Sequence, residues 1–432
     1  MKLELASYKV KEINLGSGPT RLDDGVLRVD RDEVKGLALS DSPFRDVRLH
    51  VVHPGDSVRI VHALDVVEPR HKVSGPGTVF PGVLGPPVTV GEGRTHRLEG
   101  MTVMTVGEPV EGEPTYWREA IIDMSGPGAP YTLFSRTANL VLELIAPEVP
   151  PDVPPEDLTS DKTISGSKYS RNYNLATRVA GFKVASYLAQ VTSDLAPDRM
   201  DAYELSPVAS SLPKVVYASQ EPSESIYGAT FGWQPTIFHP NEFMDGAIFR
   251  SFDGPASTKD ATYLLQNHAV VQDLYSRHGK ELNFLGVVLY PFGSENLVEK
   301  ERITSYAAKQ IKMMGADGAV LTWIGGGHLG IDFMLLCRKC EQLGITTTLI
   351  NPEMATMSGD SGFVHYVPEA DAIVSSGNYE RQVTLPAVDK VIGGTSILES
   401  GLDAAGSLTV PVRHLYGATS PLGASKMIGV QY

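Results

Sequence analysis

The sequence predicts an α/β protein in which an N-terminal β-rich domain is followed by a doubly wound, mostly parallel α/β domain. Two observations support this prediction. Before Glu119 the chain has short runs rich in Val, Thr and Gly that alternate apolar and polar residues, without a long helical period. From residue 167 onward, apolar strand-like runs alternate with helical patterns through short connections that contain glycine. This is the order that builds a parallel sheet covered on both faces.

The first domain is expected to cover residues 1–145. Its clearest signal is a strand, a turn and a second strand, formed by VRLHVV (47–52), Pro54-Gly55 and SVRIVHALDVV (57–67). Further strands are expected in VTVGEG and MTVMTVGEPV, because apolar and polar residues alternate there as well.

A proline-rich linker is expected at residues 146–166. Its first part, APEVPPDVPPED, contains five prolines. Proline lacks the backbone N–H and fixes φ, so this segment cannot form a helix or a central strand and is typical of a stiff linker. Upstream of it, Glu68 and Arg70 are interpreted as a salt bridge between the two domains.

The second domain is expected to cover residues 167–432. Strands are predicted at 212–219, 282–290, 316–324, 345–350, 371–377 and 389–394, and helices at 172–188, 261–278, 299–314 and 329–343. Gly315 and Gly344 stand where helix C-caps belong. In open α/β sheets ligands bind beyond the carboxyl ends of the strands, so that edge of the predicted sheet is where a ligand is expected.

Composition excludes several classes of function. The chain has 432 residues and a formal net charge of −14, which disfavours binding to nucleic acid and to anionic membrane surfaces. No apolar run is long enough to span a bilayer, and the N-terminus lacks a signal-type core, so a cytoplasmic location is expected. The two cysteines, Cys337 and Cys340, fall in a helical pattern and are interpreted as packing residues.

Many short motifs, in a consistent order, resemble the component B precursor of glycine, sarcosine and betaine reductase. They are GRTH (93–96), EAIIDMSGPG (119–128), EFMDGAI (242–248), QDLYSRHGK (272–280), NFLGVV (283–288), GADGAV (315–320) and LPAVDKVIGG (385–394). The resemblance extends over essentially the whole chain. It implies a subunit that pairs with a homologous second subunit and cleaves a C–N bond of a small-molecule substrate, with a partner thiol or selenol supplying the redox chemistry.

The resemblance also implies a self-processing site, because that family cuts its backbone at an Asn-Cys bond and converts the Cys into a pyruvoyl group. The matching dipeptide here is Phe252-Asp253. Asp253 has neither a thiol nor a hydroxyl from which a keto group could form. We therefore expect no pyruvoyl group and an uncut chain, although Ser251 and Ser257 leave open a serine-type cleavage.

A metal-dependent function is the main alternative. His239 and His268 flank the segment that contains Asp253. Two imidazoles and one carboxylate can hold a zinc ion with an open coordination position, and such a site would hydrolyse an amide or a cyclic amide. The simpler interpretation is that both histidines are hydrogen-bonded residues without a metal, since nearness in sequence does not fix side-chain geometry.

Two further candidates, His96 and Glu119, lie in the motifs of the β-rich domain. Together with Asp253 they are the predicted catalytic residues, since an imidazole and a carboxylate can act as base and acid. A structural role for the polar residues of these motifs is equally compatible with the sequence. A third possibility is a non-catalytic scaffold subunit that only stabilises its partner.

Overall fold

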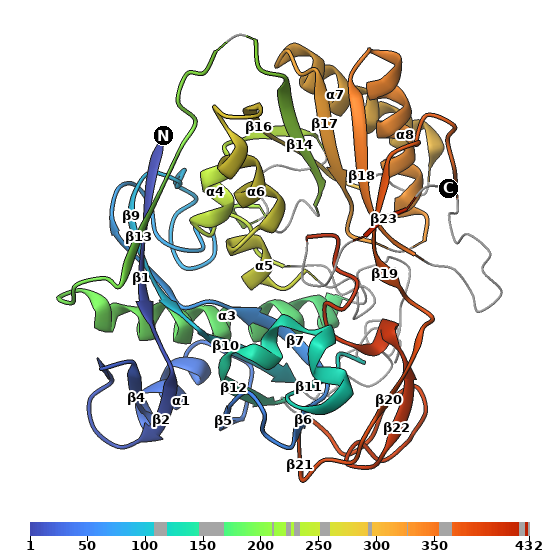
Figure 1. Ribbon diagram of the computed structural model, residues 1–432. Coiled ribbons are helices and arrows are strands. Elements are labelled where there is room, and N and C mark those ends of the chain that lie inside the picture. Colours follow the sequence, from blue (N-terminus) through green and yellow to red (C-terminus); the bar gives the residue numbers. More distant parts are fainter. Residues whose placement is uncertain are drawn as a thin grey trace.

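The protein is a mixed α/β structure, as predicted, in which β-rich sheets precede a largely parallel sheet covered by helices (Figure 1). The computed structural model describes residues 1–107, 119–146, 168–209, 211–221, 226–228, 234–250, 260–292, 296–325, 327–353, 365–422 and 428–430. The predicted linker, apart from its first residue, therefore lies outside the described residues, and so does Asp253.

Two four-stranded sheets form the β-rich part. The first has the order β13-β1-β9-β8 and the second the order β5-β12-β10-β7. Their bounds are β1 Lys2–Lys9, β5 Asp46–Val52, β7 Ala63–Val67, β8 Arg70–Ser74, β9 Gly93–Glu99, β10 Met101–Gly107, β12 Ala138–Ile145 and β13 Arg199–Glu204. Smaller sheets are formed by β2 Glu12–Gly16, β3 Arg21–Asp23 and β4 Val26–Asp30, and by β6 Val58–Ile60, β11 Ile122–Asp123 and β21 Lys390–Ile392.

Two helices complete this part of the molecule. Helix α1 (Arg31–Leu39) was not predicted, because it is short; its N-cap Asp30 accepts hydrogen bonds from two backbone N–H groups of the first turn. Helix α3 (Lys168–Ala189) packs on β10, β7 and β8. Gly181 allows α3 to lie close to β10, since a Cβ at this position would lie only 2.8 Å from Thr105 Cγ2 on that strand. Neither these helices nor any other in the described ranges is both long and apolar enough to cross a membrane.

The second sheet system has seven strands in the order β15-β16-β14-β17-β18-β19-β23. The five central strands are parallel, and the two edge strands are antiparallel to them. The strand bounds are β14 Lys214–Gln220, β15 Thr236–Phe238, β16 Asn283–Tyr290, β17 Gly318–Thr322, β18 Thr346–Glu353, β19 Ile373–Asn378 and β23 Ile428–Val430. The helices are α4 Pro240–Met244, α5 Thr262–Gln266, α6 Ala269–Arg277, α7 Leu297–Met313 and α8 Leu329–Gln342.

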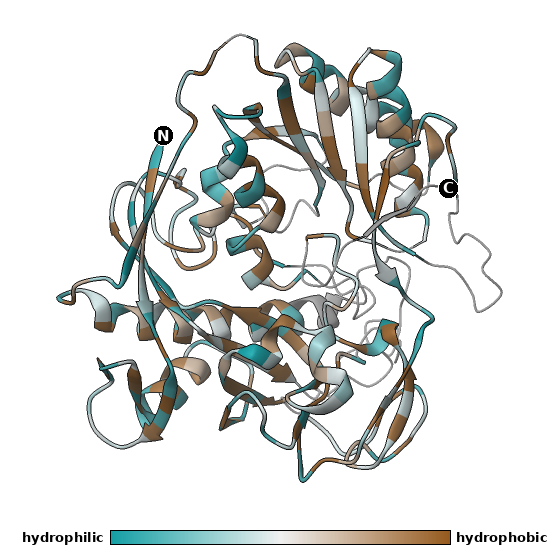
Figure 2. Cartoon of the chain, viewed as in Figure 1, coloured by the Kyte–Doolittle hydropathy of each residue, from teal (hydrophilic) through white to brown (hydrophobic). Residues whose placement is uncertain are grey.

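Side chains of this sheet are buried on both faces, as a doubly wound arrangement requires. On β14, Tyr217 belongs to the core cluster that includes α4, α5 and α6, whereas Val216 and Ala218 belong to the cluster with α7 and α8. In Figure 2 several strands of this sheet are brown along much of their length, while α7 and α8 also carry teal, polar stretches. Successive side chains of β14 therefore point into two different hydrophobic cores, one on each face of the sheet.

The C-terminal segment returns to the β-rich part. Strand β21 pairs with β6, and β20 (Gln382–Leu385) pairs antiparallel with β22 (Leu408–Pro411), so that β21 lies between them in the sequence. Strand β20 also contacts the 3-10 turn η2 (Gly126–Tyr131). The other 3-10 turns are η3 Leu133–Arg136, η4 Gln190–Thr192 and η7 Val412–His414. The buried guanidinium of Arg59 holds Asp123 with two hydrogen bonds and donates to the carbonyl groups of Pro386 and Ala404. The β-rich part thus includes residues that follow the predicted linker.

Helix ends show where the local predictions succeeded and where one failed. Gly315 follows the C-cap of α7 with φ +82°, a left-handed conformation that glycine adopts without strain. The single helix predicted at 261–278 is wrong, because the chain forms α5 and α6 with a break at Asn267 and His268. His268 caps α6 through its side chain, and a cap of this kind starts a new helix.

Phe182 on α3 provides a test of this packing. It stacks on Phe80 with ring centroids 4.0 Å apart, and it meets Phe249 edge-on. We expect Phe182→Ala to lower the free energy of unfolding by about 3–5 kcal/mol, because a large buried ring is removed. The exposed Leu175→Ala on the same helix is the control and should change it by less than about 0.5 kcal/mol. Urea unfolding measures both, and equal losses would contradict the packing.

Candidate active site at the carboxyl edge of the parallel sheet

The order of the parallel strands defines a topological switch point. From β14 the chain passes first to β16 on one side and then to β17 on the other. Ligands of open α/β sheets bind at such a point, beyond the carboxyl ends of the strands, because connections leave it in opposite directions. The residues at the carboxyl ends of β14 and β17 are therefore the first place to look for a reactive group.

Two buried carboxyl groups lie at this point, and we call Glu221 and Asp260 the carboxyl pair. Glu221 directly follows β14, and its backbone N–H donates to the Tyr290 carbonyl at 3.0 Å. Its carboxyl group accepts a hydrogen bond from Ser219 Oγ at 3.1 Å. Asp260 precedes α5 and accepts from the hydroxyl of Ser420. Both acids are almost completely excluded from solvent.

Burial and mutual repulsion separate the two acids in their affinity for a proton. The pKa of Glu221 is raised to about 8, mainly by burial and in addition by the negative charge of Asp260, while the cation of Arg250 and the hydrogen bond from Ser219 act in the opposite direction. Burial raises the pKa of Asp260 to about 6, against the effect of Arg250. Both acids are therefore harder to ionise than in water, and the repulsion between them favours a state in which only one is charged. Acids with separated pKa values are the usual arrangement for acid and base roles.

A row of hydroxyl groups, here called the hydroxyl line, connects Glu221 to the interior of the sheet. Ser219 Oγ lies 3.2 Å from Thr322 Oγ1, which lies 2.5 Å from the Tyr217 hydroxyl. These three residues come from β14 and the end of β17, so the parallel register itself aligns their hydroxyls. Beyond Tyr217 the ring of His268 packs edge-on at 4.9 Å between centroids.

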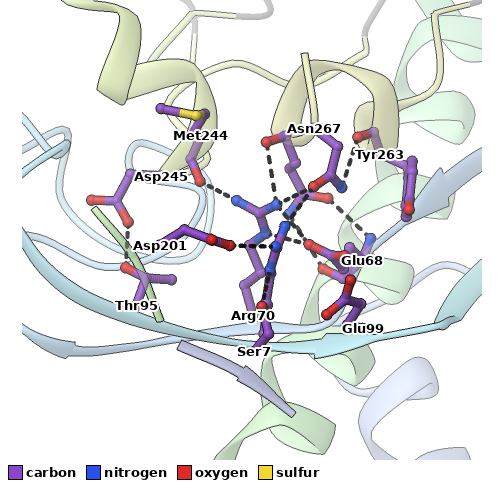
Figure 3. A network of polar contacts seen from close by, with 12 residues as sticks. Ser7, Glu68, Arg70, Thr95, Glu99, Asp201, Met244, Asp245, Tyr263 and Asn267 are labelled. Carbon is purple, nitrogen blue, oxygen red and sulfur yellow. Dashed lines mark hydrogen bonds and ion pairs between the residues drawn. The ribbon is translucent and has the colours of Figure 1, made fainter. Parts of the chain in front are cut away.

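The segment between Arg250 and Asp260 contains Phe252-Asp253, and both of its ends are attached to the β-rich part. Arg70 on β8 pairs with Glu68 at 2.8 Å and donates to the Met244 carbonyl upstream of the segment. The same guanidinium donates to the Gln266 carbonyl and to Asn267 downstream of it. Figure 3 shows these contacts converging on one buried side chain. The predicted salt bridge between Glu68 and Arg70 is therefore present and joins the two parts of the fold.

Asp65 on β7 fixes the downstream end more closely. Its carboxylate accepts from the Thr262 backbone N–H at 2.8 Å and from the Thr262 hydroxyl at 2.6 Å. The Thr262 hydroxyl also accepts from the Arg250 backbone N–H at 3.0 Å. One threonine thus ties the last described residue before the segment to the helix that follows it.

A second buried ion pair holds the upstream end. Asp245, which follows α4, pairs with Lys72 on β8 and accepts from the Thr95 hydroxyl on β9 and the Gly91 backbone N–H. The contact between Thr95 and Asp245 appears in Figure 3 as well. Two motifs far apart in the sequence, GRTH and EFMDGAI, therefore meet in one polar contact.

The predicted pair His96 and Glu119 belongs to separate networks. His96 on β9 interacts with Thr192 Oγ1 at 2.9 Å and with the Tyr8 hydroxyl at 3.4 Å, and burial lowers its pKa. Glu119 accepts from the Glu399 backbone N–H, while its other carboxyl oxygen has no partner among the described residues. Burial raises the pKa of Glu119 to about 7. Their catalytic role stays a prediction, since the two side chains bond to different partners.

The predicted metal ligands His239 and His268 both act as helix caps. His239 Nδ1 accepts from the Asn241 N–H at 3.2 Å and His268 Nδ1 from the Val271 N–H at 3.5 Å. Burial lowers the pKa of His239 to about 4 and that of His268 to about 3, so both rings are neutral. Within the described ranges no three His, Cys, Asp or Glu side chains gather as metal ligands. The third predicted ligand, Asp253, lies outside those ranges.

The sequence reasoning missed the carboxyl pair. Glu221 carried a usable signal, since it directly follows a predicted buried strand whose carboxyl end faces the ligand edge. Asp260 carried none, because only the connection through Thr262, Asp65 and the strands brings it to Glu221. Cys337 and Cys340 are buried in α8, as expected for packing residues.

Comparisons with known proteins agree on one family. The family described as glycine/sarcosine/betaine reductase component B subunits matches residues 1–429. The glycine reductase complex component B subunits alpha and beta of Acetoanaerobium sticklandii are 35% identical over 100% of both chains. Two proteins of Peptoclostridium acidaminophilum are also similar. Its sarcosine reductase complex component B subunit alpha is 36% identical over 93% of this chain and 91% of its own, and its betaine counterpart is 34% identical over 98% of both. No solved structure matches the chain.

Arg70 and Arg94 offer a matched test of the contacts that attach α4 and α5 to strand β8. Arg70 is fully buried with its partner Glu68, whereas Arg94 is exposed and pairs with Glu4 at 2.7 Å. We expect Arg70→Met to lower the free energy of unfolding by about 3–5 kcal/mol, because the carboxylate of Glu68 is left buried without its partner. Arg94→Met should cost less than about 1 kcal/mol. Urea unfolding followed by circular dichroism measures both. If Arg70→Met lowered the free energy of unfolding as little as Arg94→Met does, the buried contacts of Arg70 would not hold the two parts together.

Proposed function

Because the chain belongs to the family of glycine/sarcosine/betaine reductase component B subunits, we propose that it is a subunit of a heteromeric enzyme that cleaves a C–N bond of a small polar substrate. The observation that carries this proposal is similarity over the full length of the chain to reductase subunits named for three different amines. A reaction common to glycine, sarcosine and betaine would cleave the C–N bond, however many methyl groups the nitrogen carries. The comparisons give no support to the hydrolase alternative.

We also propose a homologous second subunit as the partner. The similar proteins are named as alpha subunits, or alpha and beta subunits, of component B of a reductase complex. The thiol or selenol that carries the redox chemistry is assigned to the partner side. Both cysteines of this chain support that assignment, because burial raises the pKa of Cys337 to about 11 and that of Cys340 to about 12, which disfavours the reactive thiolate.

The reaction centre is proposed at the carboxyl edge of the parallel sheet. Arg250 and Asp260, the described residues on either side of the segment with Asp253, both act electrostatically on Glu221. The two described residues that border this segment are therefore close enough to Glu221 to affect its charge. This arrangement favours a site that includes Glu221 and Asp260, with His96 and Glu119 as candidates for separate roles.

The absence of a pyruvoyl group is part of the proposal. At the position of the Asn-Cys bond this chain has Phe252-Asp253. The carboxylate of Asp253 offers no sulfur or hydroxyl that could leave a keto group behind. The reaction is then proposed to proceed without an imine, which a quaternary nitrogen such as that of betaine cannot form in any case.

Amine release tests the function. The chain is combined with its homologous partner subunit and the other components of the reductase complex, and glycine, sarcosine and betaine are supplied separately. We expect ammonia, methylamine or trimethylamine to be released from at least one of them, with no release when either subunit is left out. Failure to release amine from all three compounds by the assembled complex would remove the proposed function.

The mass of the purified chain tests processing. We expect one polypeptide of 46.6 kDa that does not react with phenylhydrazine, since no carbonyl cap is formed. Ser251→Ala and Ser257→Ala are the controls. Two shorter polypeptides, one blocked at its amino end, would contradict the proposal, and loss of cleavage in one of these variants would identify the serine responsible.

A further inference from the structure

Lys390 on β21 lies within hydrogen-bonding distance of a histidine that is itself held by a carboxylate. Lys390 Nζ is 3.3 Å from His50 Nδ1, and His50 Nε2 is 2.8 Å from Glu143 Oε2. We propose that Lys390 is a nucleophilic lysine that thioesters acylate, with His50 as its base and Glu143 as the residue that positions this base. The proposal does not depend on the proposed reductase function and uses no residue of the candidate active site.

The strand pattern places His50 and Glu143 side by side. In VRLHVV, Arg48 and His50 alternate with apolar residues, so their side chains share one face of β5. Strand β12 runs antiparallel to β5, with Glu143 opposite Arg48. His50 is two residues from Arg48 and is therefore a diagonal neighbour of Glu143, at a separation that long side chains can span.

Lys390 reaches this face from the C-terminal part of the chain. Strand β21 pairs in parallel with β6, where Lys390 lies opposite Val58. The backbone N–H of Lys390 donates to the Ser57 carbonyl at 3.2 Å, and that of Asp389 donates to Ser57 Oγ at 3.0 Å. The backbone is therefore fixed where the amino group of Lys390 can meet His50, although 340 positions separate the two residues.

The carboxylate of Glu143 decides which nitrogen of His50 carries the hydrogen. An ionised carboxylate only accepts hydrogen bonds, so in the neutral ring Nε2 is protonated and Nδ1 presents its lone pair to Lys390. The hydrogen bond from His50 lowers the pKa of Glu143, helped by Arg48 and by the backbone N–H of Gly393 and opposed by burial. Glu143 is therefore ionised at neutral pH and can stabilise the imidazolium that forms when His50 takes a proton.

The acceptor at Lys390 differs in kind from the acceptors at other described lysines whose amino groups have partners. Carboxylates bind the amino groups of Lys2, Lys35, Lys72, Lys300 and Lys339, and backbone carbonyl groups bind those of Lys183, Lys280 and Lys312. A carboxylate stabilises the ammonium form, and a carbonyl oxygen is too weak a base to remove its proton. An imidazole nitrogen can take that proton and leave a neutral amine, which is the nucleophilic form of lysine.

The exposure of the three side chains suits a reaction at the surface. The side chains of His50 and Glu143 are 20% and 13% exposed, whereas Lys390 is exposed. The base is thus partly sheltered from water, while the amine is open to a reagent. A thioester matches this arrangement, because its carbonyl carbon reacts with a neutral amine and its leaving thiolate needs only the proton that His50 can return.

The acylation balances in atoms and charge. Lys390 first passes one proton to His50, which releases it to solvent. The neutral amine attacks the carbonyl carbon of the thioester and forms a C–N bond. The C–S bond breaks, its electron pair leaves with the sulfur, and His50 transfers a second proton from the nitrogen to the thiolate. The products are an amide on Lys390, a free thiol and one proton, and nothing is oxidised or reduced.

Acetylation rates of single lysines test the proposal. The folded chain is treated near neutral pH with a small acetyl thioester, S-acetyl-N-acetylcysteamine, and acetylated peptides are quantified over time by mass spectrometry. We expect Lys390 to react about 10-fold faster or more than two exposed lysines. These are Lys309 on α7 and Lys35 on α1, whose amino group is 3.1 Å from Asp46. Equal rates at the three lysines would overturn the proposal.

A pair of histidine variants tests the base. His50→Gln should lower the rate at Lys390 to that at Lys309, because glutamine cannot take the proton. The rate at Lys35 should stay unchanged, which also shows that the fold is intact. His53→Gln, in the turn after β5, is the matched control and should change neither rate. An unchanged rate at Lys390 in His50→Gln, or equal losses in both variants, would refute the role of His50.

The positioning role of Glu143 has a readout that does not depend on the reaction. Nitrogen NMR distinguishes the two neutral tautomers of a histidine ring, and the signals of His50 are identified by their absence in His50→Gln. The unmodified chain should have Nδ1 unprotonated. In Glu143→Gln both tautomers should appear, because an amide donates as well as accepts, and the rate at Lys390 should fall while that at Lys309 does not. A protonated Nδ1 in the unmodified chain, or an unchanged tautomer and rate in Glu143→Gln, would contradict this role.

Discussion

The architecture depends on the buried guanidinium of Arg70. Its planar, always charged group can satisfy several acceptors at once. Here it binds the carboxylate of Glu68, two residues earlier in the chain, and backbone carbonyls on both sides of the segment between Arg250 and Asp260. An ion buried in this way is expensive to leave without partners, so the strands of the β-rich part and the helices α4 to α6 are held in one arrangement. The position of the candidate site follows from that attachment.

Several sequence motifs acquire a physical meaning through these contacts. Thr95 of GRTH and Asp245 of EFMDGAI meet across the boundary, and Asp123 of the IIDMSGPG motif pairs with the buried Arg59. These residues have no partner of the right kind nearby in the sequence. Their polar groups are satisfied only when distant segments come together, which makes them determinants of the fold around the site and explains why they stand out among apolar neighbours.

The site combines two features that reinforce each other. The switch point brings the carboxyl ends of β14 and β17 together, and the parallel register lines up Tyr217, Ser219 and Thr322 as the hydroxyl line. The attachment of α5 brings Asp260 to the same place. Burial then makes the repulsion between Glu221 and Asp260 strong, since little water is present to screen it. Ionisation of both acids at once is thereby disfavoured.

The sequence by itself determined the fold class, most strands and helices, the helix ends at Gly315 and Gly344, and the resemblance to a family of reductase subunits, because these depend on periodicity, turn residues and local motifs. The short helix α1 and the break before His268 were missed, since one hydrogen-bonding side chain decides each of them. Only the tertiary structure decided that Glu221 and Asp260 form a pair and that β21 joins the β-rich part. Both depend on contacts between distant segments, and such contacts leave no local pattern in the chain.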